Sequence, residues 1–209
     1  MSAPLAEIAR RHPEWRDWLA QAGELLDELG NPAWDAQVPR LGEAREGVPL
    51  AITAGIDPAQ APMPLLHACR RRWSDALPKA WSRGDCPVCG AWPAFAETCG
   101  VERARYLRCV RCGAAWRVHG LSCPFCANRD HATLGSLVPE DGAPRDGPPW
   151  AIEVCRRCRG YLKVFTVLQP TAPEALLVQD LKTVELDVAA EIRGYARPQG
   201  PGNGARVAA

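Results

Sequence analysis

The cysteines are the most chemically specific feature of this 209-residue chain, because eight of the ten occur as C-x-x-C pairs. Two cysteines separated by two residues are too close for favourable disulfide geometry, but a tight turn between them can direct both sulfurs at one ion. The pattern therefore predicts four metal-binding knuckles. They are Cys86/Cys89, Cys109/Cys112, Cys123/Cys126 and Cys155/Cys158.

The gaps between these pairs indicate which of them share an ion. The first two pairs are separated by 19 residues and the last two by 28, whereas only 10 residues separate the second pair from the third. The longer gaps are each long enough for a hairpin that returns to its partner pair. We therefore prefer sequential pairing to a nested arrangement, in which the two middle pairs would form one site inside the other. Sequential pairing predicts one site from Cys86, Cys89, Cys109 and Cys112, and another from Cys123, Cys126, Cys155 and Cys158.

Four thiolates in a tetrahedron accept either zinc or iron, and the spacing leaves both metals open. The proline inside "CPVCG" and "CPFC" gives these knuckles a rubredoxin-like character, which is compatible with iron. Both sites are expected to be closed, with all four positions filled by protein, so neither would activate water or substrate. The sequence offers no Ser/His/Asp set, carboxylate pair or phosphate loop. We therefore expect that the chain has no catalytic centre and is not an enzyme.

Other uses of the thiols and of the remaining candidate ligands are less favoured. A thioredoxin-like dithiol needs a C-x-x-C at the head of a helix that follows a strand, and the sequence supplies no such frame. Eight paired cysteines leave no vacant ligand position for other side chains. We expect Trp92 and Trp116 to fill the small cores of the two modules. Cys69 is expected to be a buried thiol on a helix face, and Cys99 a thiol in a turn. His119 and His131 are expected to be ordinary polar residues.

Hydrophobic periodicity predicts the elements that position the cysteines. Apolar residues three and four apart predict an amphipathic helix between residues 13 and 30, and a second helical segment over 65–81. Short alternating runs between the cysteine pairs predict small hairpins over 82–168. Helical spacing returns over 174–195.

The expected fold class is α+β, with an N-terminal helical region, two tandem rubredoxin-like or zinc-ribbon modules of four cysteines each, and a C-terminal helix. The glycines and prolines after residue 197 indicate a disordered tail. The expected division is a helical region at 1–81, a first module at 82–120, a second module at 121–168, the C-terminal helix at 169–196 and the tail at 197–209.

The composition limits the classes of partner and the compartment. The chain has 25 Lys and Arg against 24 Asp and Glu, a formal net charge of +1, so it lacks the strong basic field of a typical polyanion-binding protein. The first residues, "MSAPLAEIARRHPEWRDWLAQ", carry charges where a secretory signal needs an apolar run. No window approaches the roughly 20 apolar residues of a membrane span. We expect a cytoplasmic protein without a membrane partner, in a compartment that keeps thiols reduced.

Five segments together resemble the formate dehydrogenase accessory protein family, FdhE, over roughly Asp85 to Arg197. They are "CPVCGAWP", "RYLRCVRCGAAWRV", "LSCPFC", "CRRCRGYLKV" and "DLKTVELDVAAEIRGYAR". The aromatic residue after the second pair, the Tyr-Leu-Lys after the fourth pair and the late Asp-Leu…Leu-Asp helix make the resemblance specific.

This resemblance implies a helical part followed by two rubredoxin-like metal modules. It also implies a role in maturing cytoplasmically assembled formate dehydrogenase by contact with its catalytic subunit, without a reaction of its own; homo-oligomerisation is left open. Two features depart from the family. The family carries a longer helical region before the first pair, and a glycine normally follows the fourth pair, where this chain has Arg159. The knuckle tolerates this arginine if its backbone does not need a positive φ.

Two further functions compete with an assembly role. Five arginines beside Tyr106 and Trp116 are compatible with a nucleic-acid-binding zinc ribbon, through phosphate contacts and base stacking. We interpret this cluster instead as a solvated or partner-facing rim, because carboxylates on the late helix would oppose a polyanion. The third function is electron transfer, if the ions are iron and change oxidation state. The cluster consists of Arg103, Arg105, Arg108, Arg111 and Arg117.

Overall fold

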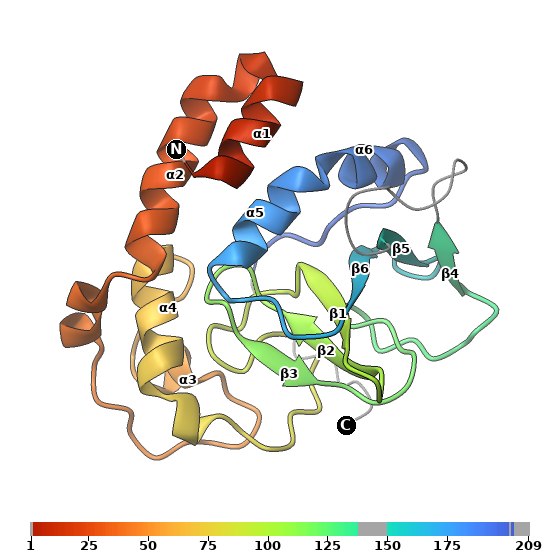
Figure 1. Ribbon diagram of the computed structural model, residues 1–209. Coiled ribbons are helices and arrows are strands. Elements are labelled where there is room, and N and C mark those ends of the chain that lie inside the picture. The colour runs from red at the N-terminus through yellow and green to blue at the C-terminus, as the bar shows by residue number, and fades with distance from the viewer. Residues whose placement is uncertain (1, 138–149, 201, 203–209) are drawn as a thin grey trace.

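The computed structural model describes residues 2–137, 150–200 and 202, and confirms the predicted α+β class. Figure 1 shows helices from both ends of the chain arranged around one sheet. The N-terminal region contains α1 (Ala3–Arg11), α2 (Arg16–Leu29), α3 (Leu50–Thr53) and α4 (Met63–Arg72), with 3₁₀ turns at Pro13–Trp15, Pro32–Gln37 and Ser74–Ala76.

The helix predicted after residue 13 is α2, which begins behind a 3₁₀ turn and ends at the C-cap residue Gly30. The second predicted segment is α4 with the 3₁₀ turn that follows it. Helix α1 was not predicted; it is short, and its Leu5 and Ile8 are buried against Leu19 of α2. Val178 and Leu181 also pack on this cluster, so the N-terminal helices contact a helix from the later part of the chain.

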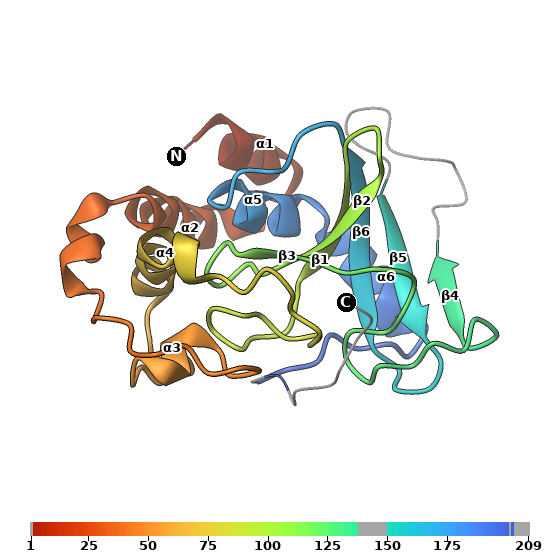
Figure 2. The same ribbon diagram turned by 90° about the horizontal axis from the view of Figure 1, so that it is seen from below.

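The four cysteine pairs lie at turns before and between the strands of one six-stranded sheet, whose strand order is β3-β2-β1-β6-β5-β4. Neighbouring strands are antiparallel except for β1 and β6, which run parallel. In Figure 2 the N-terminal helices lie beyond the β3 side of the sheet, with β4 on the opposite side. The strands are β1 (Phe95–Cys99), β2 (Ala104–Arg108), β3 (Ala115–Arg117), β4 (Leu134–Leu137), β5 (Trp150–Cys155) and β6 (Tyr161–Val167).

The two halves of this sheet repeat the same order of parts. Each half consists of a cysteine pair, two antiparallel strands, a second cysteine pair and a third strand. The halves lie head to tail, because β6, the third strand of the second half, pairs with β1, the first strand of the first half. The predicted hairpins are thus present, but they form one continuous sheet.

The predicted C-terminal helix is divided into α5 (Ala175–Lys182) and α6 (Val184–Ile192). The division falls at Thr183, whose hydroxyl donates to the Gln179 carbonyl at 2.7 Å. Leu176 of α5 packs in a cluster with aromatic residues of β1, β5 and β6, and Ala190 of α6 packs in another cluster on β5 and β6. Of the expected tail, residues 197–200 and 202 are described, and 201 and 203–209 lie outside the described residues.

Candidate metal centres

All four knuckles are held by the same pair of backbone hydrogen bonds. In the first knuckle, the Cys86 N–H donates to the Ala91 carbonyl and the Gly90 N–H donates to the Cys86 carbonyl, both at 2.9 Å. The equivalent bonds in the knuckles that begin at Cys109, Cys123 and Cys155 measure 2.8 to 2.9 Å. This frame turns the chain tightly and places the two sulfurs of each pair on the same side, as a metal knuckle requires.

The knuckles meet in the sequential arrangement rather than the nested one. Within each group of four, all the sulfurs lie within 4.8 Å of one another. A tetrahedral ion bound to sulfur at about 2.3 Å separates its ligands by about 3.8 Å, so each group can hold one ion. Across the knuckles, the Sγ–Sγ distance is 3.5 Å for Cys86–Cys112 and Cys89–Cys109, 3.6 Å for Cys123–Cys158 and 3.8 Å for Cys126–Cys155.

The first group lies in the protein core, with all four cysteines buried. The N-terminal helical region encloses it: the N–H groups of Leu50 and Ala51 donate to carbonyls of the first knuckle at 2.9 and 2.8 Å. The Arg70 guanidinium donates through Nε to the Cys112 carbonyl at 3.1 Å. These contacts fix the first group from outside its own hairpins.

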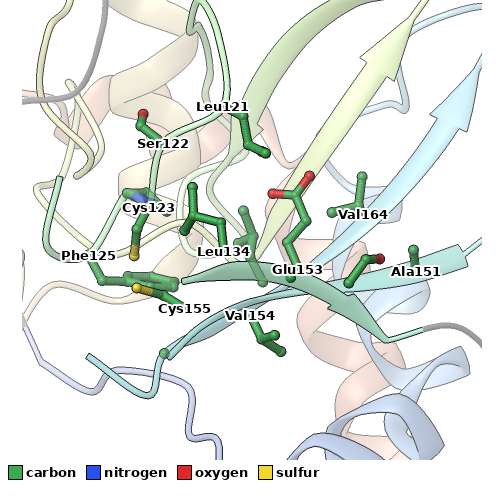
Figure 3. Close-up of a pocket in the computed structure, with 15 residues that line it drawn as sticks. Leu121, Ser122, Cys123, Phe125, Leu134, Ala151, Glu153, Val154, Cys155 and Val164 are labelled. Atoms are coloured by element: carbon green, nitrogen blue, oxygen red, sulfur yellow. The ribbon is translucent and has the colours of Figure 1, made fainter. Parts of the chain in front are cut away.

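The second group is more open, because Cys158 is exposed and Cys126 is half-buried. The buried Asn128 supports it, with its side-chain amide 3.6 Å from the Cys155 sulfur and 2.7 Å from the Thr133 hydroxyl. A cavity of about 310 Å³ lies beside this group. Cys123, Cys155 and aliphatic side chains of the sheet line it (Figure 3). The protein therefore covers the second group on fewer sides than the first.

Neighbouring sulfurs and burial shift the thiol pKa values within each group in opposite directions. In the first group, burial raises the pKa of Cys86 and Cys112, whereas hydrogen bonds from neighbouring thiols lower the pKa of Cys109. In the second group, the thiol of Cys123 donates to Cys158 and lowers the pKa of Cys158 to about 5. The same bond raises the pKa of Cys123. Each group therefore stabilises one thiolate, the form that binds metal.

The residue that follows each knuckle has a positive φ. The two groups differ in the type of residue at this position. Gly90 and Gly113 adopt φ of 71° and 75° in the first group, but Ala127 and Arg159 adopt 57° and 60° in the second. A non-glycine residue in this region costs roughly 1–2 kcal/mol. The fourth knuckle thus does have the backbone conformation for which glycine is suited, and the arginine adopts it despite the strain.

Contacts with the end of α6 offset the strain at Arg159. Its guanidinium donates to the carbonyls of Arg193 and Gly194 at 2.7 and 3.0 Å. It also stacks on the ring of Tyr195, 4.1 Å from the ring centroid, in a cation–π contact. The arginine therefore ties the fourth knuckle to the C-terminal end of α6.

The Tyr-Leu-Lys motif and the Asp-Leu…Leu-Asp motif bind each other. Lys163 is fully buried, and its Nζ lies 2.6 Å from the Asp180 carboxylate and 2.8 Å from that of Asp187. The Tyr161 hydroxyl donates to Asp187 at 2.7 Å, and Arg197 pairs with both aspartates at 2.9 and 2.7 Å. This buried network holds α5 and α6 on β6, and it includes the first residue of the expected tail.

The arginine cluster is only in part the solvated or partner-facing rim that the sequence predicts. Arg103 and Arg117 are exposed, whereas Arg108 is buried and the other two arginines are half-buried. Three of the five guanidinium groups are engaged in internal contacts, which weakens the support for nucleic-acid binding. The internal contacts are Arg108 with Glu97 and, at 2.7 Å, the Thr171 carbonyl, Arg105 with Glu153 at 2.6 and 2.8 Å, and Arg111 with the Pro58 carbonyl at 2.7 Å.

The other predicted side chains are mostly structural. Cys69 is buried on α4, and His119 and His131 are exposed and belong to neither sulfur group, as predicted. Cys99 differs from the prediction, since it ends strand β1 with its sulfur 3.8 Å from the Leu168 carbonyl. Trp116 is buried in the same core as the sulfur groups, and Trp92 is partly buried against it.

His67 is a buried residue that was not among the predicted site residues. It lies on α4, and neither ring nitrogen has a hydrogen-bond partner within the described structure. Burial lowers its pKa to about 4, so the imidazole is neutral near pH 7. A Cβ added at Gly113 would lie 3.0 Å from its ring, which places this histidine directly against the second knuckle. The signal available in the sequence was its position between Leu66 and Ala68, on the apolar part of α4.

Comparisons with known proteins place the chain in a family. No family model matches the sequence. A curated relative from Pseudomonas aeruginosa, "Protein FdhE homolog", is 31% identical over 93% of this chain and 68% of its own length. The chain belongs to the FdhE family. A second FdhE homologue, from Aquifex aeolicus, is 26% identical over 56% of the chain and 40% of its own length.

The fold of this FdhE-family protein is also that of a solved relative. The crystal structure of the FdhE protein from Pseudomonas aeruginosa matches with a TM-score of 0.58 and 24% identity, over 94% of this chain and 92% of the solved one. The resemblance predicted from the five sequence segments is therefore confirmed. Among the described helices of this FdhE homologue, none has the length and apolar character needed to cross a membrane.

Proposed function

We propose that this chain is a metal-binding accessory factor that promotes the maturation of active formate dehydrogenase by contact with its catalytic subunit. Membership of the FdhE family is the observation that carries the proposal. A cytoplasmic location and the absence of a reaction of its own are parts of the same proposal. The client enzyme gains its activity, and the chain acts by binding.

The two four-cysteine groups support a binding role rather than a catalytic one. An ion bound by four protein sulfurs has no open position for water or substrate, so it would supply a rigid cross-link between hairpins. Such cross-links restrict the backbone on both halves of the sheet and reduce the entropy that binding would otherwise cost. The residues that would hold the two ions, zinc or iron, are the eight paired cysteines.

The proposal is tested in a strain that lacks the gene for this chain. Formate oxidation is expected to fall to background in that strain and to return with the wild-type chain. It is not expected to return with a Cys86→Ser/Cys89→Ser double variant. Cys99→Ser is the matched control, because this cysteine belongs to neither group. Unchanged formate oxidation after deletion would refute the accessory role.

Electron transfer is the second candidate, and the exposure of Cys158 favours it, because an electron carrier needs its metal site near the surface. Metal analysis and an optical spectrum of protein purified without oxygen distinguish the two roles. A zinc-only protein that restores formate dehydrogenase activity excludes electron transfer. An iron protein whose spectrum changes reversibly with added reductant supports it.

A further inference from the structure

Helix α6 carries an apolar stripe on the face turned away from the sheet. Val184, Val188 and Ile192 are spaced by four residues, so they lie on one face of the helix. Val188 is 51% exposed and Ile192 is 79% exposed, whereas Ala190 is buried in the cluster on β5 and β6. The helix is therefore apolar on both its buried side and part of its outer side.

The stripe continues into a groove between the start of α2 and the junction of α5 with α6, the region at the top of Figure 1. This groove has a volume of about 440 Å³. Trp18 is 52% exposed there, an unusual fraction for a side chain of its size. We call the stripe and the groove together the α6 surface, which consists of Trp15, Trp18, Leu181, Val184, Val188 and Ile192.

Carboxylates border the α6 surface on both sides. Helix α6 contains three acidic residues and no Lys or Arg. At about 100° per residue, Asp187 and Glu191 lie on one side of the stripe and Glu185 on the other. Glu14 lines the groove. Asp187 is neutralised by the buried network, and Glu185 by Arg11, but Glu191 has no ion-pair partner among the described residues.

We propose that the α6 surface binds a basic amphipathic helix of the formate dehydrogenase catalytic subunit. The aliphatic face of such a helix would lie on the stripe and on the tryptophans, and its Lys or Arg side chains would face the bordering carboxylates. This inference deepens the proposed function and rests on it for the identity of the partner.

The charges disfavour two other occupants. A second copy of the chain would add a second unpaired Glu191 to the interface, and like charges across an interface oppose association. A membrane surface carries anionic lipids, which Glu191 would repel. A cationic helix is the occupant for which both the apolar and the charged parts of the surface are complementary.

The first experiment uses a synthetic amphipathic helix with one leucine face and one lysine face, titrated into the full chain by calorimetry. Binding is expected for this peptide, to weaken as salt is raised, and to be absent for a matched peptide with glutamate in place of lysine. The double variant Val188→Gln/Ile192→Gln is expected to weaken binding by about tenfold or more, because two aliphatic contacts are lost. Equal binding of both peptides would overturn the inference.

The matched control is Leu168→Gln, because Leu168 is 83% exposed but belongs neither to α6 nor to the groove. Its substitution removes a similar exposed side chain and is expected to leave peptide affinity unchanged. Circular dichroism checks that both variants stay folded. A loss of affinity that is the same in the control and in the double variant would also overturn the inference.

The second experiment replaces the peptide with the purified catalytic subunit. Binding to the wild-type chain that is lost in Val188→Gln/Ile192→Gln supports the inference. Binding that persists in the double variant overturns it and leaves the proposed function standing. If the subunit does not bind the wild-type chain, the proposed contact fails, and with it the assignment of the helix to that subunit.

Discussion

The two four-cysteine groups are built from the same turns but lie in different surroundings. Both have the same backbone hydrogen bonds, the same order of strands and similar sulfur–sulfur distances. The first is buried on all sides and carries glycine after each knuckle. The second exposes Cys158 and carries Ala127 and Arg159 at the corresponding positions. The same knuckle frame thus occurs in two different surroundings, and the exposure of each four-cysteine group depends on those surroundings rather than on the frame.

The largest difference is expected from removing one ligand in each group. A structural four-thiolate site contributes on the order of 10 kcal/mol to folding. Cys109→Ser is expected to unfold the first half of the sheet and leave helical signal from the N-terminal region, because Cys109 is buried in the central core. Cys158→Ser is expected to lose the second ion and keep the first. Native mass spectrometry counts the ions that each variant retains, and thermal denaturation compares their stability. Equal melting temperatures for the two variants would contradict the predicted difference between the groups.

The next largest effect on stability is expected from replacing Gly113, the residue with positive φ that follows the second knuckle. In Gly113→Ala the new Cβ would lie 2.4 Å from the Pro173 Cβ, and φ is 75°, so strain and overlap add. We expect a loss of about 2–4 kcal/mol in the free energy of unfolding. Gly90→Ala is the matched variant, since its closest neighbour is a Pro49 side-chain atom at 3.2 Å, and it should lose less. Denaturant titration measures the free energy of unfolding of both variants. A larger loss in Gly90→Ala than in Gly113→Ala would contradict the packing argument.

Access to the sulfurs should differ between the groups by a smaller but measurable factor. Because Cys158 is exposed, a chelator reaches the second group without opening the core. We expect metal release in two phases, with the second group faster by about tenfold or more, a difference of roughly 1.4 kcal/mol in barrier. Thiol alkylation followed by peptide mapping assigns each phase. A single phase, with all eight cysteines labelled together, would show that the groups open as one unit.

The smallest effect is expected at Ala127. Its φ of 57° strains the third knuckle, and glycine relieves that strain while adding entropy to the unfolded chain. Ala127→Gly is therefore expected to stabilise the protein by up to about 1 kcal/mol. The measurement is the midpoint of chemical denaturation. A lower midpoint would mean that the contacts of the alanine side chain stabilise the protein by more than the backbone strain destabilises it.

The grouping of the cysteines could be predicted from the sequence because it depends on local turns and on gap lengths. The order of strands in the sheet could not, because the parallel pairing of β1 with β6 joins segments 68 residues apart, Phe95 opposite Lys163. The break at Thr183 and the short α1 were missed for a related reason. Their stability comes from packing against other elements rather than from their own periodicity.

The arginine cluster shows where charge patterns mislead. Arginines on a predicted strand look like a surface feature until the partner strand and its register are known. In the structure Glu97 lies opposite Tyr106, next to Arg108 on the same face of the sheet, and the two charges pair in the core. Conversely, Lys163 entered the sequence analysis only as part of the Tyr-Leu-Lys motif of the resemblance. Its apolar neighbours in the strand "YLKVFTV" already indicated a buried charge that needs a partner.

Arg159 links the second four-cysteine group to helix α6. It follows the knuckle that contributes Cys155 and Cys158, and its side chain donates hydrogen bonds to the carbonyls at the end of α6. If ion binding in the second group shifts the fourth knuckle, the shift reaches the end of α6 through this side chain. By reciprocity, a partner that binds α6 only in its present position would then raise the ion affinity of the second group by the same factor by which the ion raises the affinity for the partner.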